Sequence, residues 1–256
     1  MTWVANRLCA FDCESTGADV ETARIVSAAV AFVGGGEETE EFTILVDPGV
    51  EIPEEATAVH GITSEQARRD GTPAPAALTA IADELERREP GCALVAMVAR
   101  YDLTILDREL RRHGLGDGSR FAQGVVDPFV IDKHLDRYRR GSRKLDALCE
   151  HYGATLAGAH DACFDAVAAA RVAWVIGKRG RVIRRERTHR DARENRALEQ
   201  EWSVAHSDLD RLHAAQVRWA REQAVGLAEY FATKGEPQEI DGSWPLLPPR
   251  RVEAPS

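Results

Sequence analysis

Two carboxylates lie two positions apart near the N-terminus, within the segment LCAFDCESTGAD at residues 8–19. Side chains alternate between the two faces of a β-strand, so Asp12 and Glu14 point to the same face if this apolar segment is a strand. At ~7 Å and an effective dielectric constant of ~20, their mutual repulsion would be about 2 kcal/mol. A bound cation, an arginine, or a strand end that is open to water could offset this repulsion.

Further polar residues extend this pair along the chain. Asp102 follows the apolar segment CALVAMVA and opens a helical pattern, where a carboxylate also often serves as an N-terminal cap. Asp165 lies early in an alanine-rich helical segment, and His160 precedes it by five residues. Asp161 is better explained as the cap of that helix than as a further ligand. The resulting order is Asp-x-Glu, then Asp, then His-x4-Asp.

This order resembles the DEDDh exonucleases, the DnaQ-like family that includes the proofreading epsilon subunit of bacterial DNA polymerase III and RNase T. The matching segments are FDCESTG, YDLTILDREL and AHDACFDAVAAARV, with AVHGITSEQ (58–66) and KLDALCEHYG (144–153) as accessory stretches. The resemblance covers residues 6–178. It implies an α/β fold, an RNase H-like mixed sheet flanked by helices.

The resemblance also implies two Mg²⁺ or Mn²⁺ ions as cofactors, held by Asp12, Glu14, Asp102 and Asp165. Two such ions ~3.5–4 Å apart can activate the attacking water, stabilise charge on the phosphoryl oxygens and assist the departing 3'-oxygen. Asp12 would bridge both ions, with Glu14 and Asp165 on the ion nearer the nucleophile and Asp102 on or near the other. His160 would be the general base, because an imidazole titrates near neutral pH.

Six positions near these motifs are predicted to contact the substrate: Thr16, Gly17, His60, Gly61, Val98 and Tyr101. Thr16 and Gly17 would form the turn after the first strand, where N–H groups and a hydroxyl could meet the terminal 3'-hydroxyl. A purely structural turn explains the same two residues equally well. His60 and Gly61 resemble a family segment that lies near the substrate's end.

The chain departs from the family pattern just before Asp102. Relatives usually carry a His-Asn or similar pair five and four residues ahead of this aspartate, and the asparagine helps to place the terminal nucleotide. Here the two positions hold Met97 and Val98. Arg100, beside this gap, could contact phosphate or could be an exposed arginine without a partner.

These motifs predict a 3'-to-5' exonuclease that acts on single-stranded DNA or frayed duplex ends, in proofreading, repair or end trimming, and releases nucleotide monophosphates. An exoribonuclease or oligoribonucleotide-degrading enzyme is the alternative within the same chemistry. A non-catalytic relative that binds nucleic acid or a polymerase is the alternative from another class. Val98 and the added C-terminal region favour that last alternative, whereas the intact set of acids and histidine argues against it.

The composition limits the substrates and the compartment. A net charge of -9 argues against a broad basic surface for nucleic acid, although a metal could still hold a few phosphates. Two local basic stretches, 136–144 and 177–190, could assist, or could be solvated helix faces or linkers. No apolar segment approaches the ~20 residues that cross a membrane, and the N-terminus lacks a signal peptide's uncharged segment. We therefore expect a cytoplasmic protein without a membrane partner, its five scattered cysteines reduced.

The order of the elements predicts how these residues are positioned. Three β-rich segments, RLCAFDC, RIVSAAVAFV and EEFTILVDP, come first and are predicted to be antiparallel, and helices then alternate with the short strands CALVAMVA and GVVDPFV. We expect an exonuclease domain at 1–180, a helical extension at 181–235 and a proline-rich extended tail at 236–256. Apolar residues between Leu198 and Gln223 recur at steps of four and three, which predicts a long helix or a helical hairpin. This stripe would pack on the first domain, on a second copy of the chain or on a polymerase.

Overall fold

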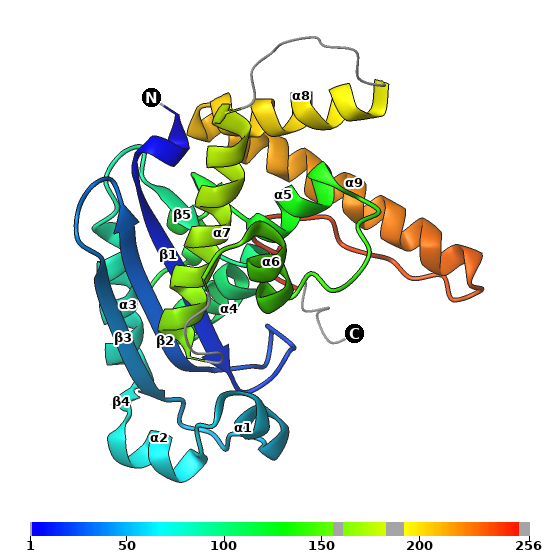
Figure 1. Ribbon diagram of the computed structural model, residues 1–256. Helices are drawn as coiled ribbons and strands as arrows, with labels where there is room; N and C mark the ends of the chain where they lie inside the picture. Colours follow the sequence, from blue (N-terminus) through cyan, green and yellow to red (C-terminus); the bar gives the residue numbers. More distant parts are fainter. Residues whose placement is uncertain (1, 156–160, 183–191, 251–256) are drawn as a thin grey trace.

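A six-stranded mixed sheet forms the centre of the molecule (Figure 1). The computed structural model describes residues 2–155, 161–182 and 192–250. The strands follow the spatial order β4-β3-β2-β1-β5-β6. Their bounds are β1 Arg7–Ser15, β2 Ile25–Gly34, β3 Glu40–Asp47, β4 Thr72–Pro73, β5 Ala93–Val95 and β6 Val125–Val126.

The first three strands form an antiparallel meander, as the sequence predicted, and β1 continues the sheet by pairing in parallel with β5. The turn between β2 and β3 contains Gly34, Gly35 and Gly36, all with positive φ, a conformation that glycine adopts without a steric penalty. Strands β5 and β6 are also parallel, so both end at the same edge of the sheet as β1. Loops that follow these strands therefore converge there.

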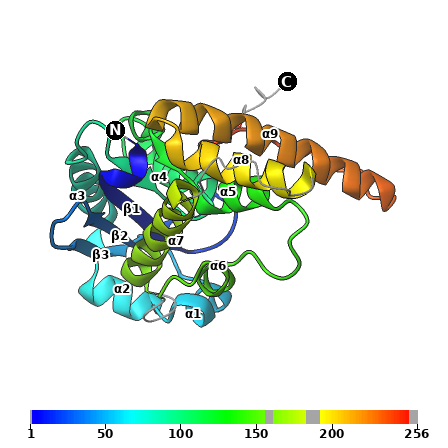
Figure 2. The same cartoon turned by 45° about the horizontal axis from the view of Figure 1, so that its top comes forward.

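Helices cover both faces of the sheet (Figure 2). Helices α3 and α4 pack on one face, and α7 packs on the other. The helix bounds are α1 Glu54–His60, α2 Ser64–Asp70, α3 Ala74–Glu86, α4 Ala99–Arg112, α5 Pro128–Leu135, α6 Leu145–Tyr152, α7 Ala162–Val182, α8 Ala192–His206 and α9 Leu209–Thr233.

The two hydrophobic cores follow from the alternation of side chains along β1. Cys9 and Phe11 belong to the core beneath α3 and α4, whereas Leu8 and Ala10 belong to the core beneath α7. All four residues are at most 2% exposed. Because both faces are covered, β1 reads as a nearly continuous apolar run until its polar end.

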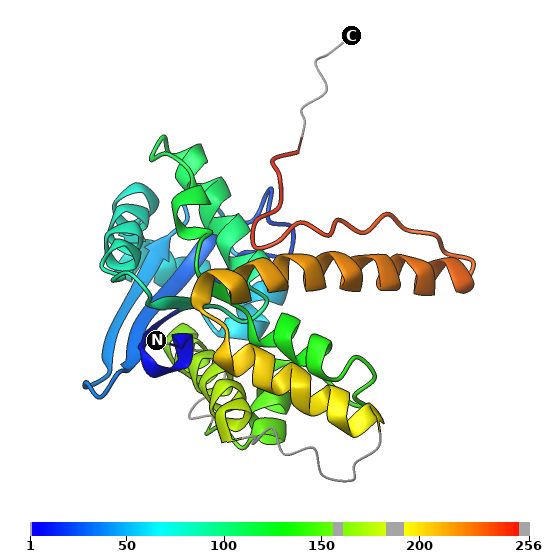
Figure 3. The same ribbon diagram turned by 90° about the horizontal axis from the view of Figure 1, so that it is seen from above.

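The C-terminal stripe forms a helical hairpin of α8 and α9 that packs on the first 180 residues (Figure 3). Gly180 lets α8 approach α7 closely, since a Cβ atom at this position would lie 2.2 Å from the carbonyl oxygen of Glu201. Leu212 and Gln216 on α9 are fully buried. The hairpin is thus covered partly by this chain's own sheet. The domain boundaries at residues 180 and 235 remain predictions.

One short element differs from its prediction. The segment GVVDPFV was expected to be a strand, but only Val125–Val126 is extended, and α5 begins at Pro128. Asp127 caps this helix, with its side chain accepting hydrogen bonds from the backbone N–H groups of Phe129 and Val130. An aspartate followed by a proline at the first helical position is a signal for a helix start, and it overrides the β-propensity of the valines.

Residues 236–250 run back along α9 without a helix or a strand (Figure 3). The segment is anchored by Trp244, which is 7% exposed and donates a hydrogen bond to Asp127 at 3.2 Å. All five cysteines are free and buried. None of the described helices is both long and apolar enough to cross a membrane.

Gln216 provides a test of how much the hairpin stabilises the sheet. Its side chain donates to the carbonyl of Val125 at 2.9 Å and accepts from the N–H of Asp127 at 2.7 Å. We expect Gln216→Leu to lower the free energy of unfolding by about 2–4 kcal/mol, because two buried backbone groups lose their partner. The control Gln223→Leu removes one partly buried bond, to Val130, and should cost about 1 kcal/mol. Urea unfolding measures both; equal losses would contradict the assigned role of Gln216.

Candidate active site

Three predicted metal ligands meet at the end of β1. Asp12, Glu14 and Asp165 each offer a carboxylate oxygen, and these oxygens lie within 4.8 Å of one another. Asp12 and Glu14 lie on β1, and Asp165 lies in the first turn of α7. All three side chains are partly buried. Residues 153 positions apart in the sequence thus form one acidic group, which we call the carboxylate cluster.

Strand alternation explains why the cluster lies on this face. Asp12 and Glu14 continue the series of Leu8 and Ala10, which faces the core beneath α7. Asp165 extends from α7 onto the same face. The strand therefore changes from apolar to acidic at the point where α7 begins, and the cluster lies at the edge of the buried layer.

Asp102 reaches β1 from the opposite helix layer and is 3% exposed. Its Oδ1 atom accepts a hydrogen bond from the backbone N–H of Cys13 at 3.3 Å and one from the Cys13 thiol at 3.4 Å. Asp102 is not part of the carboxylate cluster, but its charge acts on Asp12. The fourth predicted ligand thus lies beside the cluster and is held by the strand between its two acidic residues.

The pKa values in this region reflect burial and concentrated negative charge. Burial raises the pKa of Asp12 well above its usual value, and the charges of Asp102, Asp165 and Glu14 raise it further. Burial also raises the pKa of Asp102 to about 8, although the hydrogen bonds from Cys13 oppose this shift. The protein alone therefore favours protonated carboxyl groups, and a cation among them would favour the charged forms.

The donor set fits a hard divalent cation. Carboxylate oxygens are the ligands that suit Mg²⁺ and Mn²⁺, and three of them lie close enough to face one ion. A cation would also remove the repulsion that raises the pKa of Asp12. Asp12, Glu14 and Asp165 would hold it, with Asp102 adjacent.

The turn after β1 is fixed by Tyr101. Its hydroxyl bonds to the hydroxyl of Ser15 and donates to the carbonyl of Gly17 at 2.6 Å. The Thr16 hydroxyl accepts from the backbone N–H of Arg24 at 2.9 Å. The hydroxyl of Thr16 thus has a structural role in the turn, while the substrate contacts of Thr16, Gly17 and Tyr101 remain predictions.

His60 ends α1 beside this turn, and Gly61 allows the helix to end with a φ of 76°. The Nδ1 atom of His60 accepts from the N–H of Ile62 at 3.1 Å. Its Nε2 atom is buried and has no hydrogen-bond partner among the described residues. Burial lowers the pKa of His60, and the backbone of Ser15 opposes this shift. The substrate contacts of His60 and Gly61 remain predictions.

Val98 has φ 58° and ψ 47°, the left-handed conformation that β-branched residues rarely adopt. It is held there by Asp127, which accepts from the N–H groups of Val98 at 3.2 Å and Ala99 at 3.0 Å. Asparagine tolerates this conformation far better than valine. The backbone at this position therefore suits an asparagine, although the chain carries valine.

The sequence did not single out Asp127, which organises the loops around the site. It is 1% exposed, and its two carboxylate oxygens together bond to the starts of α4 and α5 and to Trp244. Burial raises its pKa to about 6, and these hydrogen bonds oppose the shift. The dipeptide Asp127-Pro128 was the available signal.

His160, the predicted general base, lies outside the described residues. Asp161 accepts from the N–H of Cys163 at 2.9 Å, so its predicted role as the cap of α7 is confirmed. Asp165 follows one turn later. The helix start is thus fixed independently of any metal.

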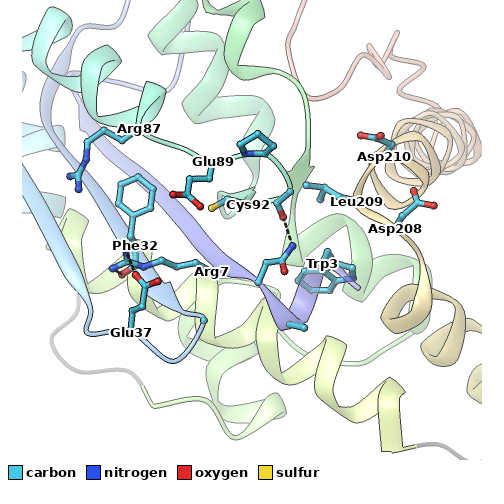
Figure 4. A pocket seen from close by; sticks show the side chains of 15 residues that line it. Trp3, Arg7, Phe32, Glu37, Arg87, Glu89, Cys92, Asp208, Leu209 and Asp210 are labelled. Carbon is cyan, nitrogen blue, oxygen red and sulfur yellow. Dashed lines mark hydrogen bonds and ion pairs between the residues drawn. The ribbon is translucent and has the colours of Figure 1, made fainter. Parts of the chain in front are cut away.

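A large cavity lies far from the carboxylate cluster. It has a volume of about 930 Å³ and opens at the start of β1, between Arg7, Phe32 and Arg87 on one side and Asp208 on the other (Figure 4). Arg7 and Glu14 are seven residues apart on one strand, which corresponds to about 23 Å. This cavity is therefore separate from the metal ligands.

With this arrangement established, the chain can be compared with known proteins. Residues 9–173 match the sequence model of the RNase_T family, described as Exonuclease. This match covers more than half of the chain, so the chain belongs to this exonuclease family, and the predicted DnaQ-like family is confirmed.

Two curated relatives agree with this assignment. A DNA polymerase III subunit epsilon-like protein of Rhodobacter capsulatus is 35% identical over 167 residues, covering 62% of this chain and 22% of the relative. A DNA polymerase III PolC-type protein of Lacticaseibacillus paracasei is 24% identical over 168 residues, covering 66% of this chain and 11% of the relative. The chain thus spans less than a quarter of the length of these relatives.

Solved structures confirm the fold. Exonuclease I of E. coli in complex with a dT13 oligonucleotide has a TM-score of 0.59 and 18% identity, covering 68% of this chain and 42% of that one. Exonuclease I of Methylocaldum szegediense has a TM-score of 0.55 and 23% identity, covering 68% and 41%. The predicted RNase H-like mixed sheet flanked by helices is confirmed.

The raised pKa of Asp102 predicts how the stability of the metal-free protein depends on pH. Between its ordinary value of 3.8 and about 8, the folded state keeps a proton that the unfolded state releases, so stability falls as pH rises. We expect a slope of up to about 1.4 kcal/mol per pH unit. Thermal unfolding with a chelator between pH 5 and 8 measures this slope, and Asp102→Asn should flatten it. An equal slope in both proteins would show that Asp102 does not carry the proton.

Val98 predicts a gain in stability from a polar substitution. Val98→Asn should raise the free energy of unfolding by about 1 kcal/mol, because it relieves the left-handed strain at a residue that is 37% exposed. Val98→Ala keeps a Cβ atom but not the branch, so its free energy of unfolding should lie between those of the wild type and Val98→Asn. A lower stability for the asparagine variant than for the alanine variant would refute the strain.

Proposed function

We propose that this chain is a metal-dependent 3'-to-5' exonuclease that removes nucleotide monophosphates from single-stranded or frayed DNA. The carboxylate cluster is the observation that carries the proposal, because it unites the first and third family motifs. The placement of Asp102 beside Asp12 adds the second motif. The same set makes a non-catalytic relative the weaker explanation.

Asp12, Glu14, Asp102 and Asp165 would hold two Mg²⁺ or Mn²⁺ ions. Such ions supply Lewis-acid stabilisation of the phosphoryl oxygens and of the leaving 3'-oxygen when bound. His160 takes a proton from the attacking water, and the Asp161 cap keeps the following helix turn in place.

The turn held by Tyr101 and the buried His60 would bind the 3'-terminal nucleotide. Thr16 and Gly17 directly follow β1, which carries Asp12 and Glu14, and the imidazole of His60 lies near the backbone of Ser15 at the end of the same strand. Internal hydrogen bonds support both elements without a substrate. Such a site binds without first ordering its loops.

DNA as substrate is supported by exonuclease I, whose solved complexes contain dT13 and dA16 oligonucleotides. A polymerase partner is supported by the relatives named as DNA polymerase III proteins. The distal half of α9 offers an apolar surface for such a partner or for a second copy, with Val225, Leu227 and Tyr230 exposed. A cytoplasmic location is part of the same proposal.

Nuclease assays on 5'-labelled oligomers with Mn²⁺ test the proposal. The labelled oligomer should shorten one nucleotide at a time from its 3' end. A phosphate on the 3' end should block this hydrolysis. Asp12→Asn and Glu14→Gln should each reduce the rate by about a thousandfold or more, since each removes an oxygen charge from the metal site. Asp70→Asn, at an exposed carboxylate on α2, is the matched control and should leave the rate unchanged.

Matched DNA and RNA oligomers decide the substrate. A faster rate on DNA supports the proposal, and equal rates on both would defeat the DNA assignment. Activity that survives both substitutions would come from another site or from a contaminant. No activity in the purified wild type with either metal would favour the binding-only alternative.

A further inference from the structure

Three basic side chains on α4, on α5 and just after α5 lie close enough for their charges to interact, in a chain whose net charge is -9. Arg100 is in the first turn of α4, Lys133 is near the end of α5, and Arg137 follows that helix. None of the three forms an ion pair with a described carboxylate. Arg100 donates to the carbonyl of Asp241 at 2.7 Å, and Lys133 lies 5.1 Å from the ring centre of Phe129.

These cations share one region of the surface. Burial lowers the pKa of Lys133, and the charges of Arg143, Arg137 and Arg100 lower it further. Like charges close together raise the energy of the free protein and attract anions, and here the Asp241 carboxyl, whose pKa the charge of Arg100 helps to lower, offsets part of this charge. The surface formed by Arg100, Lys133 and Arg137 is called the basic track below.

The loop that carries Arg137 is rigidly anchored. Asp132, 1% exposed, accepts hydrogen bonds from Arg139 at 3.3 Å, from Arg143 at 2.8 Å and from the Tyr152 hydroxyl at 2.9 Å. Two arginines of the basic stretch 136–144 therefore hold the loop, and the exposed Arg137 remains available for a ligand.

Helix α9 supports the track from behind. A Cβ atom at Gly226 would lie 2.3 Å from a guanidinium nitrogen of Arg137, so the arginine packs directly on the helix backbone. Gln223 donates to the carbonyl of Val130 on α5 at 2.9 Å. The C-terminal hairpin lies outside the family match at 9–173, but it packs against Arg137, which lies within that match.

The basic track shares α4 with a predicted metal ligand. Arg100 precedes Asp102 by two residues at the start of this helix, and its side chain is directed to the tail segment at Asp241, whereas Asp102 is directed to Cys13 on β1. Asp127 bonds to the first N–H groups of both α4 and α5, so the two helices start from one point. A strand whose 3' end lies at the carboxylate cluster would meet these cations if it leaves the site over the starts of α4 and α5. Tyr138, 79% exposed, follows Arg137 and offers a ring on which a base could stack.

We propose that Arg100, Lys133 and Arg137 bind the backbone phosphates of a single DNA strand on the 5' side of the nucleotide being removed. This inference rests on the proposed exonuclease function. The contacts are to phosphate, so they increase affinity without reading sequence. They also give the C-terminal hairpin a role, because α9 packs against Arg137.

The test compares wild type with Lys133→Gln/Arg137→Gln on two substrates with Mn²⁺. On a thymidine oligomer of about 20 nucleotides, KM should rise about 10-fold at 0.1 M salt, with kcat unchanged. The plot of log(kcat/KM) against log[salt] should become less steep by about 1.4, since each phosphate contact on a single strand contributes about 0.7. Hydrolysis of an aryl ester of thymidine 5'-monophosphate, which reaches only the metal site, should be unchanged.

The control Arg87→Gln/Arg120→Gln removes the same charge at arginines that are paired with Glu40 and Glu86 instead of lying in the basic track, and its KM should match the wild type. A similar rise in KM for the control would show that overall charge, and not the basic track, determines the affinity. An unchanged KM in the track variant, with an active wild type, would overturn the track alone. A wild type that hydrolyses neither substrate would overturn the proposed function instead. Thermal unfolding of each variant confirms that it is folded.

Discussion

Repulsion among carboxylates at the end of β1 is the constraint on which the site depends. Asp12, Glu14 and Asp165 lie within 4.8 Å of one another, and Asp102 adds its charge from the other helix layer. The fold keeps them together because each is fixed by an element whose position is set by apolar packing: β1 at the centre of the sheet, α4 on one face and α7 on the other. The free energy of burying these two layers therefore maintains a charge arrangement that is itself unfavourable.

Asp127 links this site to the C-terminal part of the chain. Its carboxylate bonds to the starts of α4 and α5 and to Trp244, while its N–H donates to Gln216. A buried acceptor with several N–H partners is favourable only if all of them stay in place. The hairpin and the tail are consequently part of the support of α4, the helix that carries Asp102.

Val98 shows how hydrogen bonds can hold a backbone conformation that disfavours the residue's own side chain. The left-handed backbone before α4 is retained through the hydrogen bonds to Asp127, even though valine is strained there. Strained residues persist where the surrounding structure over-determines them, often at functional sites. The loop before Asp102 thus depends on its neighbours more than on its own residue preferences.

The sequence by itself determined the strand pattern, the ordered acidic motifs and the helix cap at Asp161, because these depend on alternation, spacing and local hydrogen bonds. It also showed the apolar stripe from Leu198 to Gln223, but not which surface this stripe covers. Only the tertiary structure decided that α9 packs on β6, that Asp102 approaches from the opposite layer, and that Asp127 joins two helix starts. These contacts join residues far apart in the chain, and burial and long-range packing, which local patterns do not encode, select them.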